Sequence, residues 1–354
     1  MYEKDTLSAL DAITEAQRIA FAPMLFQTAL CLRNSGVLSW LDKRGKQGSD
    51  LEEITEHSTL NEYGVSLLLD MGLSGRIVTH KAGRYYLAKV GHFLLHDTMT
   101  RVNMDFTHDV CYQGLFHLSD ALKEEKPSGL RVFGNWPTIY PALSQLPERA
   151  KESWFAFDHY YSDAAFDAAL PHIFATGPTK LYDVGGNTGK WALRCCRYNE
   201  NVTVTPLDLP EQIALATKNI ANEGFSHRIG FYPVDMLSTA ALPGEADIWW
   251  MSQFLDCFSP EQIVAMLTRV AQVMKPGARL CIMELFWDAQ KFEAAAFSLN
   301  ATSLYFTCMA NGNSRFYSVE KFYHYLEQAG FRVEQRLDNL GVGHTLLICH
   351  KNEQ

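Results

Sequence analysis

A glycine-rich turn between an apolar segment and an expected helix constrains the fold of this chain most strongly. The sequence runs Thr179-Lys-Leu-Tyr-Asp-Val-Gly-Gly-Asn-Thr-Gly-Lys190, and Asp208 follows in Val-Thr-Pro-Leu-Asp-Leu-Pro. These segments predict a buried strand, a turn, a helix from about Thr188 and the end of a second strand. Such an order is typical of a nucleotide-binding crevice in a parallel α/β sheet, where glycines admit a ligand close to the backbone and the acid can bind ribose hydroxyls.

The spacing of the loop residues excludes two common phosphate-binding loops. The three glycines do not form G-x-G-x-x-G, and Trp191 stands where a P-loop requires Ser or Thr. What remains is D-x-G-x-N-x-G from Asp183 to Gly189, with Asn187 at the usual position of a middle glycine. Asn tolerates a positive φ better than most residues. A plain glycine turn in another α/β domain stays the alternative at this point.

The charge balance and the cysteines bound the partners and the location. The 354 residues suffice for two domains, and 31 basic against 40 acidic residues give a net charge of −9, which disfavours nucleic acid. We expect no membrane partner, because the sequence shows neither a signal-like N-terminus nor an apolar run long enough to span a bilayer. The eight cysteines form no C-x-x-C pair and several lie in apolar runs. They predict reduced core residues of a cytoplasmic protein and no metal site.

Residues 1–105 predict a helical domain with a two-stranded wing. Apolar residues recur at helical spacing over residues 12–40, and Ser49 or Asp50 can cap the next helix. A further helix is expected over residues 61–71, followed by a strand, a glycine turn and a strand over residues 76–87. This order is winged-helix-like.

A winged helix often belongs to a DNA-binding regulator, which is the non-enzymatic alternative. A recognition helix should offer Arg, Lys, Asn or Gln to the groove. The helix expected over residues 61–71 has no Lys or Arg and carries Glu62 and Asp70, although the wing holds Arg84 and other basic residues. We therefore expect this domain to serve in dimerisation.

Residues 106–175 predict further helices interrupted by prolines. The run from Trp154 to Phe166 is strongly aromatic and predicts a core helix that can also wall an aromatic substrate pocket. Phe155 and His159 are candidate substrate-binding residues in this run, and Asn300 is a third candidate further along the chain.

Residues 176–354 alternate between expected strands and helices. The strands are expected at Lys180–Val184, Thr203–Leu207, Ile229–Pro233, Ala246–Met251, Arg279–Leu285, Phe331–Arg336 and His344–His350, and the main helices at Thr188–Arg197, Pro210–Asn222, Pro260–Val273 and Val319–Gln328. Four acids lie at or just beyond strand ends, namely Asp183, Asp208, Asp235 and Asp256. Ligands bind off the carboxyl ends of strands in an open α/β sheet, so we expect the site there.

At this point the whole chain resembles the S-adenosylmethionine-dependent O-methyltransferases that act on phenols and other small aromatic or polyketide acceptors. The motifs that carry the resemblance are the glycine loop, Leu207-Asp-Leu-Pro, Val234-Asp-Met, Ser252-Gln-Phe-Leu-Asp-Cys-Phe-Ser-Pro-Glu, Met274-Lys-Pro-Gly-Ala-Arg-Leu and Phe316-Tyr-Ser-Val-Glu-Lys-Phe. The resemblance implies a class I methyltransferase fold, with a Rossmann-like seven-stranded sheet behind a winged-helix-like domain, and a homodimer in secondary metabolism. It also implies S-adenosyl-L-methionine as cofactor and a small aromatic substrate, free or tethered to a carrier protein.

The resemblance also assigns cofactor contacts residue by residue. Asp183, Gly185 and Gly189 would line the amino-acid portion of the cofactor. Asp208 would bind the ribose hydroxyls, since a carboxylate offers two acceptors to two donors. Around the adenine it implies Leu209, Asp235 and Met236, and Ser252 and Gln253 stand where the family often has lysine and tryptophan.

The catalytic position departs from the family pattern. Where members carry His-Asp-Trp-Ser with histidine as general base, this chain has Asp256-Cys-Phe-Ser. Glu284 aligns with a second family acid, and a buried pair of carboxyl groups can share a proton and so raise the pKa of one of them. Alternatively, Asp256 only caps the helix that begins near Ser259. His159 or His344 could also serve as the base.

Four functions stay open on the sequence alone. The leading one is methyl transfer to the hydroxyl of a small aromatic acceptor. The missing histidine motivates the second, methylation of a ring carbon ortho to a phenol, and the third, a cofactor-binding hydroxylase or decarboxylase that transfers no methyl group. The fourth is the DNA-binding regulator.

Overall fold

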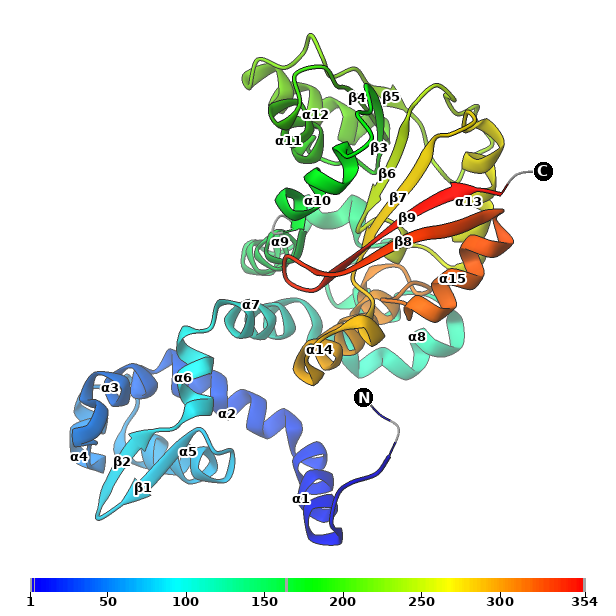
Figure 1. Ribbon diagram of the computed structural model, residues 1–354. Helices are drawn as coiled ribbons and strands as arrows, with labels where there is room; N and C mark the ends of the chain where they lie inside the picture. The colour runs from blue at the N-terminus through cyan, green and yellow to red at the C-terminus, as the bar shows by residue number, and fades with distance from the viewer. Residues whose placement is uncertain (1, 3, 163–164, 353–354) are drawn as a thin grey trace. The chain divides into compact units, whose positions relative to one another are not determined.

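The computed structural model describes residue 2, residues 4–162 and residues 165–352. The chain divides into two compact units, residues 1–109 and residues 110–354 (Figure 1). No helix of the described residues is long and apolar enough to cross a bilayer.

The first unit is a helical domain with a short hairpin. Its elements are α1 (Ala9–Ala20), α2 (Ala22–Asn34), α3 (Val37–Arg44), α4 (Leu51–Glu56), α5 (Glu62–Ser74), β1 (Val78–Lys81), β2 (Arg84–Leu87), α6 (Lys89–His96) and α7 (Thr98–Phe106). The apolar segment of residues 12–40 forms parts of three helices, because Pro23 lies in the first turn of α2 and Gly36 adopts φ 90° before α3. Asp50 caps α4, as one of the two residues expected there.

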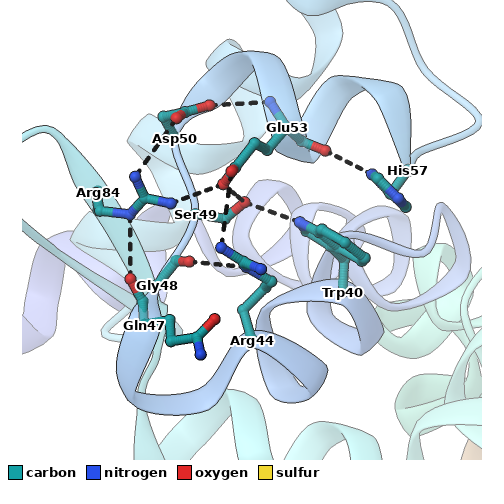
Figure 2. A network of polar contacts seen from close by, with 9 residues as sticks. All are labelled: Trp40, Arg44, Gln47, Gly48, Ser49, Asp50, Glu53, His57 and Arg84. Atoms are coloured by element: carbon teal, nitrogen blue, oxygen red, sulfur yellow. Dashed lines mark hydrogen bonds and ion pairs between the residues drawn. The ribbon is translucent and has the colours of Figure 1, made fainter.

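The hairpin of this unit is tied to α4 by a polar network (Figure 2). Arg84 of β2 donates to Glu53 Oε2 at 2.8 Å and to the Gln47 carbonyl oxygen at 3.1 Å. Ser49 Oγ donates to the same Glu53 oxygen at 2.9 Å and accepts from Trp40 Nε1 at 2.8 Å. Arg84, one of the basic side chains of the wing, thus pairs within the domain.

The second unit is built on a seven-stranded sheet. Its strands are β3 (Lys180–Val184), β4 (Thr203–Asp208), β5 (Tyr232–Pro233), β6 (Ile248–Ser252), β7 (Arg279–Glu284), β8 (Phe331–Leu340) and β9 (His344–Lys351). They lie in the order β5-β4-β3-β6-β7-β9-β8, with β9 antiparallel to both of its neighbours and the other pairs parallel. The expected α/β fold with seven strands is confirmed.

Helices cover both faces of this sheet (Figure 1), and a hydrophobic core lies between the helices and the sheet on each face. One core packs α13 (Pro260–Val273) and α15 (Val319–Gln328) against it, and the other packs α10 (Phe166–Phe174), α11 (Lys190–Tyr198) and α12 (Pro210–Asn222). The remaining helices of the unit are α8 (Leu118–Glu124), α9 (Glu148–Ser162) and α14 (Glu293–Tyr305). Because β3, β4, β6 and β7 run parallel, their carboxyl ends meet at one edge, where the candidate residues lie.

Candidate functional site

The loop after β3 adopts the backbone that its sequence requires. Gly185, Asn187 and Gly189 all have positive φ, at 74°, 47° and 81°. The expectation that Asn187 replaces a glycine in this conformation is confirmed. A Cβ on Gly185 would lie 2.3 Å from the Phe254 ring, so this position excludes any side chain. The loop therefore keeps its backbone bare at the edge of the sheet, and α11 begins directly behind it.

Asp208, at the end of β4, holds two segments of this edge together. Its Oδ2 accepts from the Asn187 amide and its Oδ1 from the Leu209 amide, each at 2.8 Å. Burial raises the pKa of Asp208, while these two hydrogen bonds lower it. Each carboxylate oxygen still has a lone pair available for a ribose hydroxyl.

Asp183 is the buried acid beneath the loop. It is 3% exposed, and its Oδ2 has no hydrogen-bond partner among the described residues. Burial, reinforced by the charge of Asp208, raises the pKa of Asp183 to about 8. An unpaired buried oxygen at a bare glycine loop fits a ligand that brings positive charge or hydrogen-bond donors, as the amino group and sulfonium of S-adenosylmethionine do.

The other cofactor candidates surround the same edge. Leu209 is an exposed residue at the N-cap of α12, and exposed Asp235 uses one oxygen to accept from the Leu237 amide at 2.8 Å. Met236 is buried in a core cluster of the sheet. Ser252 ends β6, and its buried hydroxyl has no hydrogen-bond partner in the part of the chain that the structure describes. Gln253 follows with φ 47°.

Asp256 and Glu284 come together beside this edge. Glu284 ends β7, is 2% exposed, and its Oε1 accepts from the amides of Phe254 and Leu255 at 3.1 and 3.0 Å. Its Oε2 has no partner among the described residues. Asp256 is buried in the short 3₁₀ helix of residues 255–257, where its Oδ1 accepts from Cys257 Sγ at 3.5 Å. The Glu284 carboxylate thus anchors the loop that carries Asp256.

Asp256 does not cap the following helix. The N-cap of α13 is Ser259, whose hydroxyl accepts from the Gln262 amide while the Gln262 side chain accepts from the Ser259 amide. Ser259, three residues after Asp256, therefore holds the N-cap position of α13. The alternative that Asp256 is a helix cap is therefore wrong.

Burial dominates the electrostatics of this acid pair. It raises the pKa of Asp256 to about 7, with a hydrogen bond from Cys257 acting in the opposite direction and the charge of Asp158 adding to the rise. Burial and then the charge of Asp256 raise the pKa of Glu284 well above its ordinary value. Two carboxyl groups so placed hold at least one proton between them near neutral pH.

The residues that the sequence predicts to bind the substrate lie on α9 and α14. Phe155 is 39% exposed on α9, with its ring stacked near exposed His159, whose Nδ1 lies 3.2 Å from Lys190 Nζ at the start of α11. Asn300 is half-buried on α14. Trp154 Nε1 donates to Tyr305 OH at 2.6 Å and so links the two helices. The contact with Lys190 places His159 beside α11, the helix that follows the glycine loop.

His344 is separated from the acid pair. It is fully buried, and burial lowers its pKa to about 4. Its neighbour Thr345 pairs with Glu284 across β9 and β7, so His344 points to the opposite face of the sheet. His344 is therefore not placed to act with Glu284.

Sequence reasoning missed residues that support the loop of residues 254–258. Asp158 acts on Asp256 from α9, Asn311 donates to the Cys257 carbonyl at 2.7 Å, and Tyr317 donates to the Phe258 carbonyl at 2.6 Å. Asp158 stands in the aromatic run, but only tertiary contact brings it to Asp256.

Comparison with known proteins places the chain among methyltransferases. A model of the O-methyltransferase domain matches residues 115–332, which is more than half of the chain, and a Dimerisation2-like domain matches residues 14–85. The chain belongs to the O-methyltransferase domain family. It is a methyltransferase, and S-adenosylmethionine is its cofactor.

Similar proteins agree with this assignment. L-tyrosine C(3)-methyltransferase of Streptomyces lavendulae is 27% identical over 292 residues, covering 80% of this chain and 78% of the relative. The S-adenosylmethionine-dependent methyltransferase SibL has the same fold with a TM-score of 0.73 at 22% identity, covering 95% of this chain and 98% of SibL. Human N-acetylserotonin methyltransferase, solved with S-adenosylmethionine, aligns over 100% of both chains with a TM-score of 0.61 at 19% identity.

Proposed function

We propose that this methyltransferase transfers a methyl group to the hydroxyl oxygen of a small phenolic acceptor, with Asp256 as the general base. The observation that carries the proposal is the buried pair of Asp256 and Glu284. It lies beside the sheet edge where the candidate cofactor residues are found. S-adenosylmethionine supplies a methyl group made electrophilic by its sulfonium. A phenol must lose one proton as its oxygen takes that methyl group, and a base with a pKa near the working pH serves this best.

Asp256 meets that requirement through its surroundings. An exposed aspartate is a weak base, but burial brings its pKa to about 7. Glu284 positions Asp256 by accepting from the two amides that precede it, and burial together with the Asp256 charge raises the pKa of Glu284 and so favours its protonated form. The proton of the phenol would pass to the Asp256 carboxylate as the oxygen–methyl bond forms and the sulfur–methyl bond breaks, and then to solvent.

The cofactor contacts extend the proposal. We assign Asp208 to the ribose diol, Asp183 with Gly185 and Gly189 to the amino-acid portion, and Leu209, Asp235 and Met236 to the adenine surroundings. Ser252 ends β6 and Gln253 follows it at the same edge, and we assign both to the adenine surroundings as well. We place the acceptor against residues of the 106–175 segment, with Phe155 and His159, and against Asn300.

Methylation at a ring carbon ortho to the phenol is the second candidate. The specific observations in its favour are the similarity to a tyrosine C(3)-methyltransferase and the aspartate in place of the family histidine. The same base would remove the phenol proton, and the ring carbon of the phenolate would take the methyl group as the sulfur–methyl bond breaks. The ring proton at that carbon would then leave, and the oxygen would take back one proton to restore the phenol.

A product analysis tests the two candidates. The purified chain is incubated with S-adenosylmethionine and a panel of phenols, and S-adenosylhomocysteine and methylated product are quantified together. A product without a titratable phenol supports oxygen as the acceptor atom, whereas a product that keeps its phenol supports carbon. Conversion of a phenol without stoichiometric S-adenosylhomocysteine would contradict methyl transfer.

We also propose a homodimer assembled through the first unit. Helix α1 buries none of its residues within the chain, and Leu10, Ile13 and Ile19 are exposed on it. Light scattering on the full chain should give twice the mass of 40.0 kDa.

We also propose a cytoplasmic location. All eight cysteines are free, and seven of them are wholly or partly buried, which supports a reducing compartment.

A further inference from the structure

A cluster of metal-ligating side chains lies in the first unit, in residues for which the methyltransferase reaction has no use. His92 and His96 are four residues apart on α6, so both project from one face of that helix. Asp42 of α3 meets them there. Its Oδ2 lies 2.9 Å from His96 Nε2, and its Oδ1 lies 3.9 Å from His92 Nδ1.

We propose that Asp42, His92 and His96 form a binding site for a divalent transition-metal ion, with Zn²⁺ as the best-suited occupant. The three ligand atoms lie within 4.8 Å of one another. In a tetrahedral zinc site with bonds of about 2.0–2.1 Å, ligand atoms are roughly 3.3 Å apart. The distance from Asp42 to His96 is already shorter than that, and a small rotation of His92 closes the remaining gap.

The side chains are free to make that adjustment. His92 and His96 are 58% and 46% exposed, and their rings lie 4.7 Å apart at an angle of 48°. Two imidazoles and a carboxylate suit zinc, which accepts three protein ligands and keeps its fourth position open. Binding would replace the hydrogen bond between His96 Nε2 and Asp42 Oδ2.

A cavity of about 410 Å³ lies beside the cluster, and Asp42 and His92 help to line it. Lys46 and Lys89 line the same cavity and add positive charge. An anion such as chloride or a carboxylate is therefore a better fourth ligand than a neutral group. The ion would fasten α6 to α3 within this unit.

This inference departs from the expectation that the chain binds no metal. That expectation rested on cysteine spacing, and all eight cysteines are free. A histidine pair at i, i+4 becomes a site only when a third ligand approaches from another element, and Asp42 lies 50 residues before His92 in the sequence.

The test is a calorimetric titration of the chelator-treated full chain with ZnCl₂. It is done in a Cys31→Ser background, because Cys31 is an exposed thiol of the same unit that could bind zinc itself. We expect one equivalent to bind with a micromolar Kd. His96→Ala and Asp42→Asn should each weaken binding at least about tenfold. His80→Ala, which removes an exposed histidine of the wing, should leave it unchanged.

A second readout guards against misfolded variants. With EDTA present, His92→Gln and His96→Gln should melt at nearly the same temperature as the parent, whereas added Zn²⁺ should raise the melting temperature of the parent alone. If the parent binds no tight equivalent of Zn²⁺, the proposal is overturned and only the hydrogen bond between His96 and Asp42 remains. Equal zinc binding by the parent and His96→Ala would overturn it as well.

Discussion

Two glutamates, one in each unit, show how differently the chain uses the same side chain. Glu53 in the first unit accepts from Ser49 and Arg84, and these partners lower its pKa (Figure 2). Glu284 in the second unit is buried with one oxygen unpartnered, and its pKa is raised well above the ordinary value. A partly exposed carboxylate with hydrogen-bond donors around it links neighbouring elements. A buried carboxyl group without a positive partner has a raised pKa and binds a proton more readily.

This difference in pKa distinguishes acids that stabilise the structure from acids that can take part in the reaction. Buried acids with raised pKa values cost stability and cluster at functional sites. The acids at the sheet edge of the second unit, Asp183, Asp256 and Glu284, all show this pattern. The four predictions that follow test the contrast, beginning with the largest effect.

Removing the Asp208 carboxylate should have the largest effect. Asp208→Ala loses the group assigned to the ribose diol and also releases the amide of Asn187. We expect S-adenosylmethionine affinity to fall about 10⁴-fold, since the two ribose hydrogen bonds to this charged group can contribute up to about 3 kcal/mol each. Calorimetry with S-adenosylmethionine and S-adenosylhomocysteine measures this, and unchanged affinity would remove Asp208 from the cofactor site.

Neutralising the acid pair should slow turnover without weakening cofactor binding. We expect Asp256→Asn to lower kcat about 10²–10⁴-fold, the usual contribution of a general base. Glu284→Gln keeps a carbonyl acceptor for the amides of Phe254 and Leu255 and should cost less. Steady-state kinetics with an accepted phenol decide this, and a Glu284→Gln enzyme slower than Asp256→Asn would reverse the two roles.

The stability of the second unit should fall as pH rises. The pKa of Asp183 is raised in the folded state, so the folded chain binds more protons than the unfolded chain between its ordinary value and about 8. That contribution is present at low pH and is lost as pH rises towards 8. Each kcal/mol lost lowers Tm by about 2–4 °C in a unit of this size. Asp183→Asn should flatten the Tm profile between pH 5 and 8, and an unchanged slope would show that Asp183 does not cause it.

The smallest effect is expected from the surface network of the first unit. Arg84→Ala removes contacts to Glu53, Asp50 and the Gln47 carbonyl, all at partly exposed positions. Ion pairs of this kind contribute little, and we expect a Tm change of at most a few degrees with methyl transfer unaffected. Scanning calorimetry of the full chain measures it. A lower catalytic rate in this variant would contradict the view that the Arg84 network has no role in the reaction.

The centre of the sheet could be predicted from sequence, because β3, β6 and β7 are short, mostly apolar runs that are buried along their length. Lys180–Val184 is a strand with the expected bounds. The strand expected over Ile229–Pro233 is reduced to Tyr232–Pro233 at the sheet edge, where one side has no partner strand. The helix expected from Thr188 begins at Lys190, because Gly189 with φ 81° is the N-cap.

The candidate site is less predictable from the sequence than the sheet, because the burial of its acids depends on tertiary packing. The positive φ of Asn187 follows from residue type, and the acids at the strand ends follow from the strand pattern. The helix-cap alternative for Asp256 could be rejected only once Ser259 and Gln262 were seen to form the capping box. The influence of Asp158 depends on how α9 packs, which no local pattern encodes.

The most direct test of the central claim is the pH dependence of kcat/KM for methyl transfer by the wild-type chain and by Asp256→Asn. A base must be deprotonated to act, so the wild-type rate should rise to a plateau above a pKa of about 7. The variant should be slower by at least about 10²-fold, and that rise should be absent. A variant with the wild-type rate and the wild-type pH profile would contradict the account.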